Sequence, residues 1–347
     1  MLWKVVLALL SVAAVVGFSP GSANAQSQSC VTDVRCYVYS QWNPVCIPEL
    51  PPGAFDCHGG APWEMICSAI TNQCPPVAAP NETCPTCGQG KPVAGAPISL
   101  ATGNTYIEQT DVRIPGLAGG MGLHRTWNSK WPSTQSAFRV GLFGPNWRSN
   151  FEERMFAGDD HYTKYSRGDG SFWSFGYNGT NLSVAAPANI AATLTRDDTY
   201  WTLTFQNGEK RLFSVLSGSL VSIIDRNGNT TQLSYDATNR LTTVADPAGR
   251  HLYFGYPDSS SFLVTSVTSD FGVSLTYTYD GQGRLTQVAR PGQTTLNFEY
   301  DSNSLITAVK DAQGKILEAH TYDSNGRGLT STRANGVDAV TITYPNP

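Results

Sequence analysis

The sequence has little charge and few residues of the kinds that usually perform catalysis. Only 14% of its 347 residues are Asp, Glu, Lys or Arg, against about 25% in an average soluble domain. The formal net charge is −4, so no basic excess favours DNA or RNA, and we expect no nucleic-acid partner. The histidines are scattered without metal-ligand spacing, and we expect them to be ordinary surface or strand residues: His58, His124, His161, His251 and His320.

Recognisable nucleotide-binding and catalytic motifs are also missing. No GxxxxGK[ST] segment occurs, which excludes a P-loop. The GxSxG match at 17–21 lies in the expected signal peptide over 1–25, whereas a nucleophile elbow requires a strand, a turn and a helix in the mature protein. We therefore predict no catalytic residues, no cofactor and no metal site, and we expect a protein that is not an enzyme.

Long hydrophobic runs are absent except at the amino terminus. There, Lys4 is followed by the fourteen residues VVLALLSVAAVVGF and later by Ala23-Asn24-Ala25. This order is typical of a secretory signal peptide, and the run is shorter than the about 20 residues that span a bilayer. We predict a signal peptide over 1–25, no transmembrane span after cleavage, and a secreted or cell-envelope protein (periplasm, outer membrane or cell surface). An uncleaved anchor is the alternative.

Cysteine is absent after residue 87 and concentrated before it. The eight cysteines are Cys30, Cys36, Cys46, Cys57, Cys67, Cys74, Cys84 and Cys87. An even number in a short exported segment predicts disulfides, whose pairing the sequence leaves open. Zinc is the competing explanation, but the segment holds a single CxxC and the single histidine His58, whereas structural zinc usually shows two close ligand pairs. We assign 26–90 to a disulfide-stabilised segment; an enzyme hidden in it is a weaker alternative.

What the sequence does contain is turns, aromatics and a repeat. Glycine (33), proline (21) and 11% aromatic residues favour β structure. Aromatic residues recur every 21 to 23 positions, each of the first six is followed about fourteen residues later by a glycine, and an aliphatic residue lies between them. A shared period of this length predicts a repeat architecture. The ladders are Phe213, Tyr235, Tyr256, Tyr279, Tyr300, Tyr322 and Tyr344; Gly228, Gly249, Gly272, Gly292, Gly314 and Gly336; and Leu220, Leu241, Leu263, Leu285, Leu305 and Leu329.

Each repeat reads as strand, turn, strand, turn. In the unit 235–256, residues 241–246 and 252–256 alternate with period two, and Asp246-Pro247-Ala248-Gly249 suits a type I turn. A single hairpin cannot bury its own face, so neighbouring hairpins should stack into one sheet with a shared core. We predict a mainly β fold: a curved antiparallel sheet of β-hairpin repeats behind a small disulfide-rich segment.

The repeats resemble the YD repeats of RHS proteins over roughly 205–344. The resemblance rests on the tyrosine–aspartate steps and on the Arg-Leu-Thr pieces at 239–242 and 283–286. Tyr256 departs from the pattern because Pro257 follows it. We assign 205–347 to the repeats. The steps are Tyr235-Asp236, Tyr279-Asp280, Tyr300-Asp301 and Tyr322-Asp323.

A second resemblance covers about 95–175. The segments 97–104, 111–116, 125–128 and 144–147 are similar to the domain that commonly precedes RHS repeats in bacteria. We assign 95–204 to this amino-terminal β domain and expect it to form the cap or first turn of the repeat sheet. Turn residues predict hairpins at Arg167–Gly170 and at Asn207-Gly208.

Two short motifs have simpler explanations than binding. Residues 225–229, DRNGN, resemble the start of a calcium loop, but positions six and twelve hold Thr230 and Asp236 instead of the Gly and Glu of an EF-hand. Arg167-Gly168-Asp169 spells an adhesion tripeptide, yet it lies at an expected hairpin tip. We interpret both as turns.

In RHS proteins the repeats form a sheet that spirals into a hollow shell, and this resemblance implies an open, partial shell here. Our leading hypothesis is an exported, non-enzymatic RHS-repeat protein of the cell envelope or surface. Its aromatic and polar side chains suggest cell-surface carbohydrate, cell wall or envelope proteins as partners. The alternative is the amino-terminal part of a contact-dependent, polymorphic-toxin delivery protein, in which the repeats surround a carboxy-terminal toxin domain.

Overall fold

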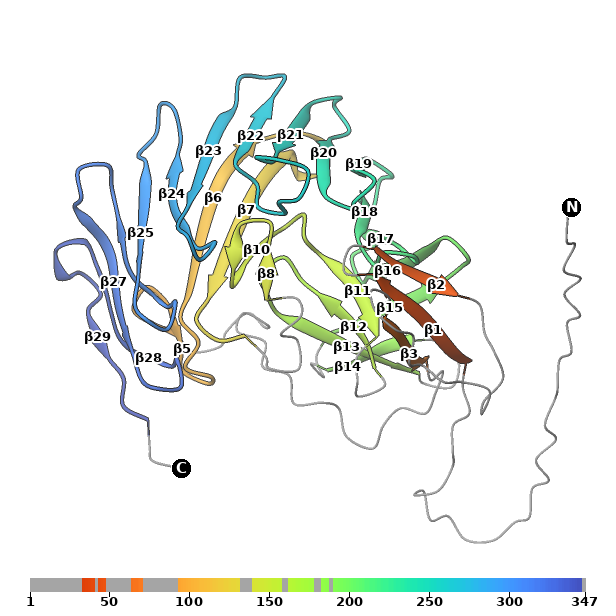
Figure 1. Ribbon diagram of the computed structural model, residues 1–347, viewed down its shortest axis with the longest axis horizontal. Helices are drawn as coiled ribbons and strands as arrows, with labels where there is room; N and C mark the ends of the chain where they lie inside the picture. The colour runs from red at the N-terminus through yellow and green to blue at the C-terminus, as the bar shows by residue number, and fades with distance from the viewer. Residues whose placement is uncertain are drawn as a thin grey trace, which may run out of the picture. The chain divides into compact units, whose positions relative to one another are not determined.

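The computed structural model describes residues 33–40, 43–47, 64–70, 93–131, 139–157, 162–177, 182–186 and 190–344 (Figure 1). The signal peptide expected over 1–25 lies outside these residues. Five of the eight cysteines, Cys30, Cys57, Cys74, Cys84 and Cys87, also lie outside them.

A small antiparallel sheet comes first in the described chain. Its strands are β1 (Asp33–Ser40), β2 (Asn43–Ile47) and β3 (Glu64–Ile70), in the order β2-β1-β3. The backbone register pairs Cys36 of β1 with Cys67 of β3, and Tyr37 of β1 with Cys46 of β2. The disulfide framework stays a prediction.

One antiparallel sheet of nineteen strands contains all the repeats, and its strands follow one another in chain order. No α-helix occurs in the described ranges, and the expectation of a mainly β, antiparallel fold is confirmed. The strands are β11 (Arg154–Ala157), β12 (Thr163–Ser166), β13 (Phe172–Tyr177), β14 (Leu182–Ala186), β15 (Ala192–Arg196), β16 (Tyr200–Phe205), β17 (Lys210–Ser214), β18 (Leu220–Ile224), β19 (Thr230–Tyr235), β20 (Leu241–Ala245), β21 (His251–Gly255), β22 (Ser266–Ser269), β23 (Ser274–Tyr279), β24 (Leu285–Ala289), β25 (Leu296–Tyr300), β26 (Ile306–Lys310), β27 (Ile316–Tyr322), β28 (Gly328–Arg333) and β29 (Val340–Thr341).

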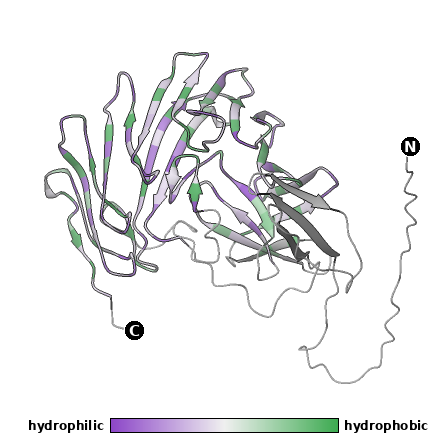
Figure 2. Cartoon of the chain, in the orientation of Figure 1, coloured by the Kyte–Doolittle hydropathy of each residue, from purple (hydrophilic) through white to green (hydrophobic). Residues whose placement is uncertain are grey.

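Strict period-two alternation fails inside the repeats. Leu241 and Val244, three positions apart, are both buried. The register of β19 on β20 shifts between Ser234 and Tyr235, because Ser234 pairs with Thr243 while Tyr235 pairs with Leu241. The extra residue in β20 is a β-bulge, which lets two residues an odd number apart face the same side. Figure 2 shows hydrophobic and hydrophilic residues both occurring along the strands of this sheet.

The segment before the large sheet forms a separate hairpin. Strand β6 (Tyr106–Ile114) pairs with β7 (Met121–Asn128), the short helix η1 (Leu117–Gly119) joins them, and β10 (Trp147–Ser149) pairs with the other side of β7. Two strand pairs accompany them: β4 (Val93–Ala94) with β5 (Ile98–Ser99), and β8 (Val140–Gly141) with β9 (Gly144–Pro145). A last short helix, η3, spans Ala334–Gly336. The segment 95–204 was expected to form the cap or first turn of the repeat sheet. Its strands β11 to β16 begin the large sheet, whereas β6, β7 and β10 pack against the face of that sheet.

The β6–β7 hairpin crosses the repeats. At one end the N–H of Gly328 donates to the carbonyl of Gly103 at 2.8 Å, and at the other Arg250 donates to the carbonyl of Pro115 at 3.1 Å. Between them, edge-to-face aromatic pairs join Trp127 to Tyr322 and Trp147 to Phe298, and Phe143 lies 4.8 Å from the ring of Tyr277. In Figure 1 the strands from β18 to β29 follow one another along this hairpin. Both tryptophans are fully buried, and truncating either to alanine would cost about 3–5 kcal/mol.

The first strands of the large sheet curl back on themselves. The N–H of Met155 in β11 donates to the carbonyl of Gly218 at 2.8 Å, and Arg154 pairs with Ser219 beside β18. The eight strands β11 to β18 therefore form a closed ring. An eight-stranded ring is just wide enough for side chains to fill, and here Tyr165, Trp173, Phe205 and Phe213 contact one another edge to face. At Gly218 (φ +69°), an added Cβ would lie 2.0 Å from the carbonyl oxygen of Met155.

Candidate functional site

The aspartate of each tyrosine–aspartate step fixes a hairpin turn. One oxygen of Asp236 accepts hydrogen bonds from the backbone N–H groups of Thr238 (2.9 Å) and Arg240 (3.0 Å), and the other accepts from Arg240 Nε at 2.7 Å. Burial opposes ionisation of Asp236, but these hydrogen bonds outweigh it and lower its pKa to about 2. Asp280, Asp301 and Asp323 accept the same pair of backbone hydrogen bonds in their own turns.

The tyrosine of each repeat donates a hydrogen bond to a backbone carbonyl fifteen or sixteen residues earlier. The aliphatic ladder of the sequence marks these acceptors or their immediate neighbours. We call this series the tyrosine ladder: Tyr235 to Leu220 (2.6 Å), Tyr256 to Leu241 (2.8 Å), Tyr279 to Val264 (2.6 Å), Tyr300 to Leu285 (2.8 Å), Tyr322 to Ile306 (2.6 Å) and Tyr344 to Gly328 (2.7 Å). Burial raises the pKa of Tyr256, so the hydroxyl keeps its proton and remains a donor. The ladder starts at Tyr235 because Phe213 has no hydroxyl.

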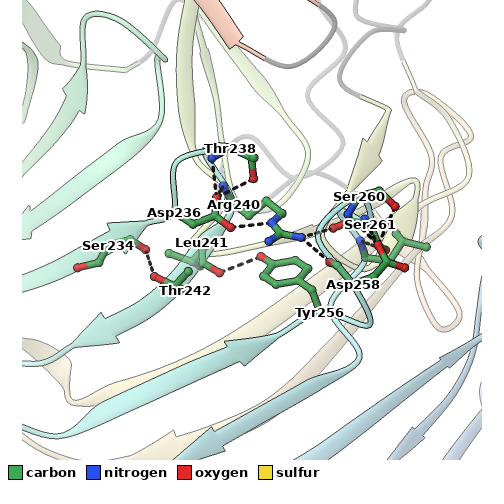
Figure 3. A network of polar contacts seen from close by, with 11 residues as sticks. Ser234, Asp236, Thr238, Arg240, Leu241, Thr242, Tyr256, Asp258, Ser260 and Ser261 are labelled. Atoms are coloured by element: carbon green, nitrogen blue, oxygen red, sulfur yellow. Dashed lines mark hydrogen bonds and ion pairs between the residues drawn. The ribbon is translucent and has the colours of Figure 1, made fainter.

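An arginine joins each of three turns to the next tyrosine. Figure 3 shows Arg240 between the Asp236 turn and the ring of Tyr256, whose hydroxyl is directed at Leu241. The guanidinium lies 4.6 Å from the centre of the Tyr256 ring and also donates to the carbonyls of Asp258 and Ser261. The same cation–π contact joins Arg284 to Tyr300 (4.9 Å) and Arg327 to Tyr344 (4.2 Å). An Arg-Leu pair in the first two turns, and Arg327-Gly328 in the third, thus hold the following tyrosine by its face and by its hydroxyl.

The repeat glycines occupy turns that require a left-handed backbone. The six have φ between +77° and +95°, a region that L side chains rarely adopt. At Gly249 an added Cβ would meet nothing within 4 Å, so backbone conformation, not space, restricts this position. The six are Gly228, Gly249, Gly272, Gly292, Gly314 and Gly336.

A buried ion cluster that sequence reasoning did not predict ties the β6–β7 hairpin to the repeats. Arg125 of β7 forms an ion pair with Asp111 of β6, and both side chains are fully buried. Tyr277 of β23 donates to Asp111 at 2.8 Å, and Arg290 lies 4.0 Å from the same carboxylate. Burial disfavours the charge on Arg125, but Asp111 outweighs it and raises the pKa of the guanidinium. Because Trp147 also covers Arg125 at 4.7 Å, this cluster is closed to a ligand and holds the structure together.

A polar cavity of about 300 Å³ lies between β7, the turn after β12 and the β16–β17 hairpin. We call it the polar pocket. Glu153 at its wall is nine-tenths buried and accepts hydrogen bonds from the hydroxyl of Tyr165 (2.6 Å) and from Arg211 Nε (3.1 Å). Arg211 also pairs with Glu209. Burial and the nearby Glu153 carboxylate raise the pKa of Tyr165.

The histidines do not gather into one site. Within the described ranges, no group of three His, Cys, Asp or Glu side chains is placed to hold a metal ion. His124 lines the polar pocket, and His251 contacts Asp270 at 2.8 Å on the surface. His320 is buried in β27, with Glu318 3.6 Å away. His58 and His161 lie outside the described residues.

The two short motifs form turns. Asp225 accepts backbone hydrogen bonds from Asn227 and Asn229, and its second oxygen accepts from the Asn229 side chain. In the tripeptide at 167–169, Arg167 and Asp169 form an ion pair at 2.9 Å, and the N–H of Gly170 donates to the carbonyl of Arg167. Both carboxylates therefore have partners within their own turns.

These features define an antiparallel β-hairpin repeat protein. The tyrosines and aspartates of its repeat signature form hydrogen bonds that fix the turns and join one repeat to the next. Family comparisons agree with this class. Residues 95–175 match a domain of unknown function, DUF6531, and residues 217–251 and 263–295 match the RHS Repeat. The chain contains RHS repeats, as its resemblance to the YD repeats indicated.

Curated relatives share a limited part of the chain. The tRNA nuclease WapA of Bacillus subtilis (strain 168) and the tRNA3(Ser)-specific nuclease WapA of Bacillus spizizenii are each 27% identical over 142 residues. The match covers 41% of this chain and 6% of each relative. The chain therefore corresponds to a small fraction of the length of these proteins.

Solved toxin complexes show a weaker similarity. A structure of the Photorhabdus luminescens Tc holotoxin pore has 12% identity and a TM-score of 0.27, over 54% of this chain and 11% of that one. The crystal structure of TcdB2-TccC3-Cdc42 has 17% identity and a TM-score of 0.27, over 68% of this chain and 12% of that one. Scores this low do not establish a shared overall fold. Within the part of the chain that the structure describes, no helix is long and apolar enough to cross a membrane.

Proposed function

We propose that this chain is a wall segment of an RHS-type toxin-delivery protein. In this role the chain is not itself an enzyme; its repeats build a stiff sheet, and a toxin domain carried by a longer product is the cargo. The tyrosine ladder carries the proposal. It engages the signature residues of six successive repeats in structural bonds, as a wall requires.

The family and the curated relatives support this role. The chain contains RHS repeats after a DUF6531 domain. The matching WapA proteins are named tRNA nucleases, and only 6% of their length matches this chain. We propose that any corresponding toxic activity of a longer product resides outside the repeats, and that the product acts outside the cell or at its surface.

Carbohydrate or cell-wall binding is a separate proposal, and the repeat tyrosines do not supply it. Their hydroxyls are bonded to carbonyls, and three of their rings contact arginine. Tyr253 is the one strand tyrosine of the repeats among the described residues that is largely exposed, at 42% of its surface, and one face of its ring stacks on His251 at 5.8 Å. A sugar site would therefore have to use groups other than the tyrosines of the ladder.

The wall role is tested by protection of a cargo. The native product is purified from its own host, its intact mass is measured, and it is digested with increasing amounts of thermolysin. We expect a product longer than this chain, with a polypeptide that survives digestion at doses that cut free protein. Substituting Tyr256→Phe and Tyr300→Phe together should lower the amount of thermolysin needed to cut the protected polypeptide. Tyr253→Phe, the same chemical change at an exposed position, should leave that amount unchanged. A native product without further polypeptide or co-purifying cargo would refute the proposal.

A further inference from the structure

The polar pocket is independent of the repeat signature and of the wall role proposed above. It is lined by residues of β7, of the 167–169 turn and of the β16–β17 hairpin, which are brought together where the first eight strands close into a ring. Glu153, Arg211 and Glu209 form one connected series of charges along its wall.

The groups of the pocket have hydrogen-bonding capacity left over. Glu153 accepts both of its side-chain hydrogen bonds through Oε2, which leaves Oε1 as an acceptor. Arg211 donates through Nε and Nη1, which leaves Nη2 as a donor. Glu209 uses Oε1 alone, and the Asn207 side chain accepts one bond through Oδ1, which leaves its amide nitrogen as a donor. Donors and acceptors therefore lie side by side in one cavity.

The charges of the pocket are nearly balanced. Two arginines, Arg167 and Arg211, stand against the three carboxylates of Glu153, Asp169 and Glu209. Each arginine is paired with a carboxylate at about 3 Å, at 2.9 Å for Arg167 and 3.1 Å for Arg211. With one negative charge in excess, these groups give no positive field to hold a phosphate and only a weak negative field to hold a polyamine. They still offer strong donors and acceptors to a neutral ligand, because hydrogen bonds to ionised groups are stronger than neutral ones.

The pocket wall is fixed before a ligand arrives. The side chain of Asn150 donates to the carbonyl of Gly122 at 3.0 Å and accepts from the N–H of His124 at 2.9 Å. The 167–169 turn lies tightly against it, since an added Cβ on Gly168 would approach the Asn150 Cα to 2.6 Å. The Arg211 guanidinium lies 5.4 Å from the centre of the Phe205 ring, and its Nε and Nη1 are held by Glu153 and Glu209. Preorganised polar groups reduce the entropy lost on binding.

We infer that the polar pocket binds a neutral saccharide unit. Adjacent sugar hydroxyls each donate and accept, which suits alternating carboxylate, guanidinium and amide groups. The half-buried Phe205 lends the lining an apolar side chain. A cavity of about 300 Å³ lies at the small end of ligand pockets, which fits one or two sugar rings.

The test is saturation-transfer difference NMR and titration on the full chain. The probes are glucose, N-acetylglucosamine, maltose, cellobiose and chitobiose, with glucose 6-phosphate and spermidine as charged comparisons. We expect at least one neutral sugar to bind saturably. Its affinity should fall at least tenfold in Glu209→Gln, which keeps the shape of the side chain, and also in Asn207→Ala.

The matched control is Glu108→Gln, which removes an exposed carboxylate of β6 outside the pocket and should leave binding unchanged. Circular dichroism confirms that each variant is folded. The inference is overturned if no neutral sugar saturates the wild-type chain. It is also overturned if the charged probes bind more tightly, or if the two pocket variants bind as well as the control. None of these results bears on whether the repeats protect a cargo.

Discussion

Replacing Tyr256 by phenylalanine removes one bond of the tyrosine ladder and nothing else. The ring, its packing and its contact with Arg240 at 4.6 Å all remain, while the carbonyl of Leu241 loses a donor at 2.8 Å. The first position of the aromatic ladder already carries Phe213, which is fully buried in the ring of strands β11 to β18. Phenylalanine therefore fits this kind of position, and the expected loss is that of the hydroxyl.

The loss of stability depends on the carbonyl of Leu241, which is left without its donor. A hydrogen bond contributes about 0.5–1.5 kcal/mol net, and a buried group left without a partner costs about 1–3 kcal/mol. We expect Tyr256→Phe to lower the free energy of unfolding by about 1–2 kcal/mol. In a protein of this size that corresponds to a fall in Tm of about 1–3 °C. Tyr253→Phe, at an exposed tyrosine with no hydrogen bond to the described residues, should change stability by less than about 0.5 kcal/mol.

The assay is urea unfolding of both variants and the wild type, followed by far-ultraviolet circular dichroism and by calorimetry. Equal slopes of free energy against urea in the three proteins would show that only the native state is affected. If Tyr256→Phe and Tyr253→Phe were equally stable, the hydroxyls of the tyrosine ladder would not couple the repeats.

Three further predictions concern charge, acid and the turns. Asp111→Asn should lower the free energy of unfolding by about 3–5 kcal/mol, because it leaves the buried Arg125 without its anion; chemical denaturation measures this loss, and a change under 1 kcal/mol would contradict it. Asp236 has a folded pKa of about 2, below its usual 3.8; its contribution is therefore present above about pH 4 and lost as the pH falls toward 2, and Asp236→Asn should flatten the fall in Tm over that window. Gly249→Ala should cost about 1 kcal/mol because φ is +77°, whereas Ala248→Gly in the same turn should cost less; thermal unfolding with the reverse order would exclude a left-handed requirement.

Much of the repeat region could be predicted from the sequence, since its determinants are local. The period of Tyr235 and its successors, the turn at 246–249 and the hairpin at Asn207-Gly208 depend on residues a few positions apart, and the structure has strands and turns there. The sequence also indicates roughly where the acceptors of the tyrosine hydroxyls lie, because the aliphatic ladder marks the residues whose carbonyls accept, or their neighbours. The bulge that places Leu241 and Val244 on one face could not, because it depends on pairing with the neighbouring strand.

The rest depends on contacts between distant parts of the chain. Asp111 and Arg125 lie on the two arms of one hairpin, but nothing in either arm indicates that Tyr277, 166 residues away from Asp111, completes their cluster. The polar pocket likewise joins Glu153 to Arg211 across 58 residues. Its signal in the sequence is weak, because charged residues near turns are usually solvated. Residues that lie far apart along a repeat array meet only when the sheet curves enough to bring them together. The local sequence pattern does not specify this curvature.

The position of the β6–β7 hairpin in the chain has a consequence for the order of folding. Its contacts with the repeats join residues separated by 135 positions at Arg250 and Pro115 and by 166 at Tyr277 and Asp111. Closing loops of that length is slow when the whole chain is free. During synthesis, however, this hairpin emerges before every repeat that it touches, so each new hairpin meets a surface already made. A chain that folds as it emerges, amino terminus first, would then add repeats one at a time, and refolding of the whole chain from denaturant should be much slower.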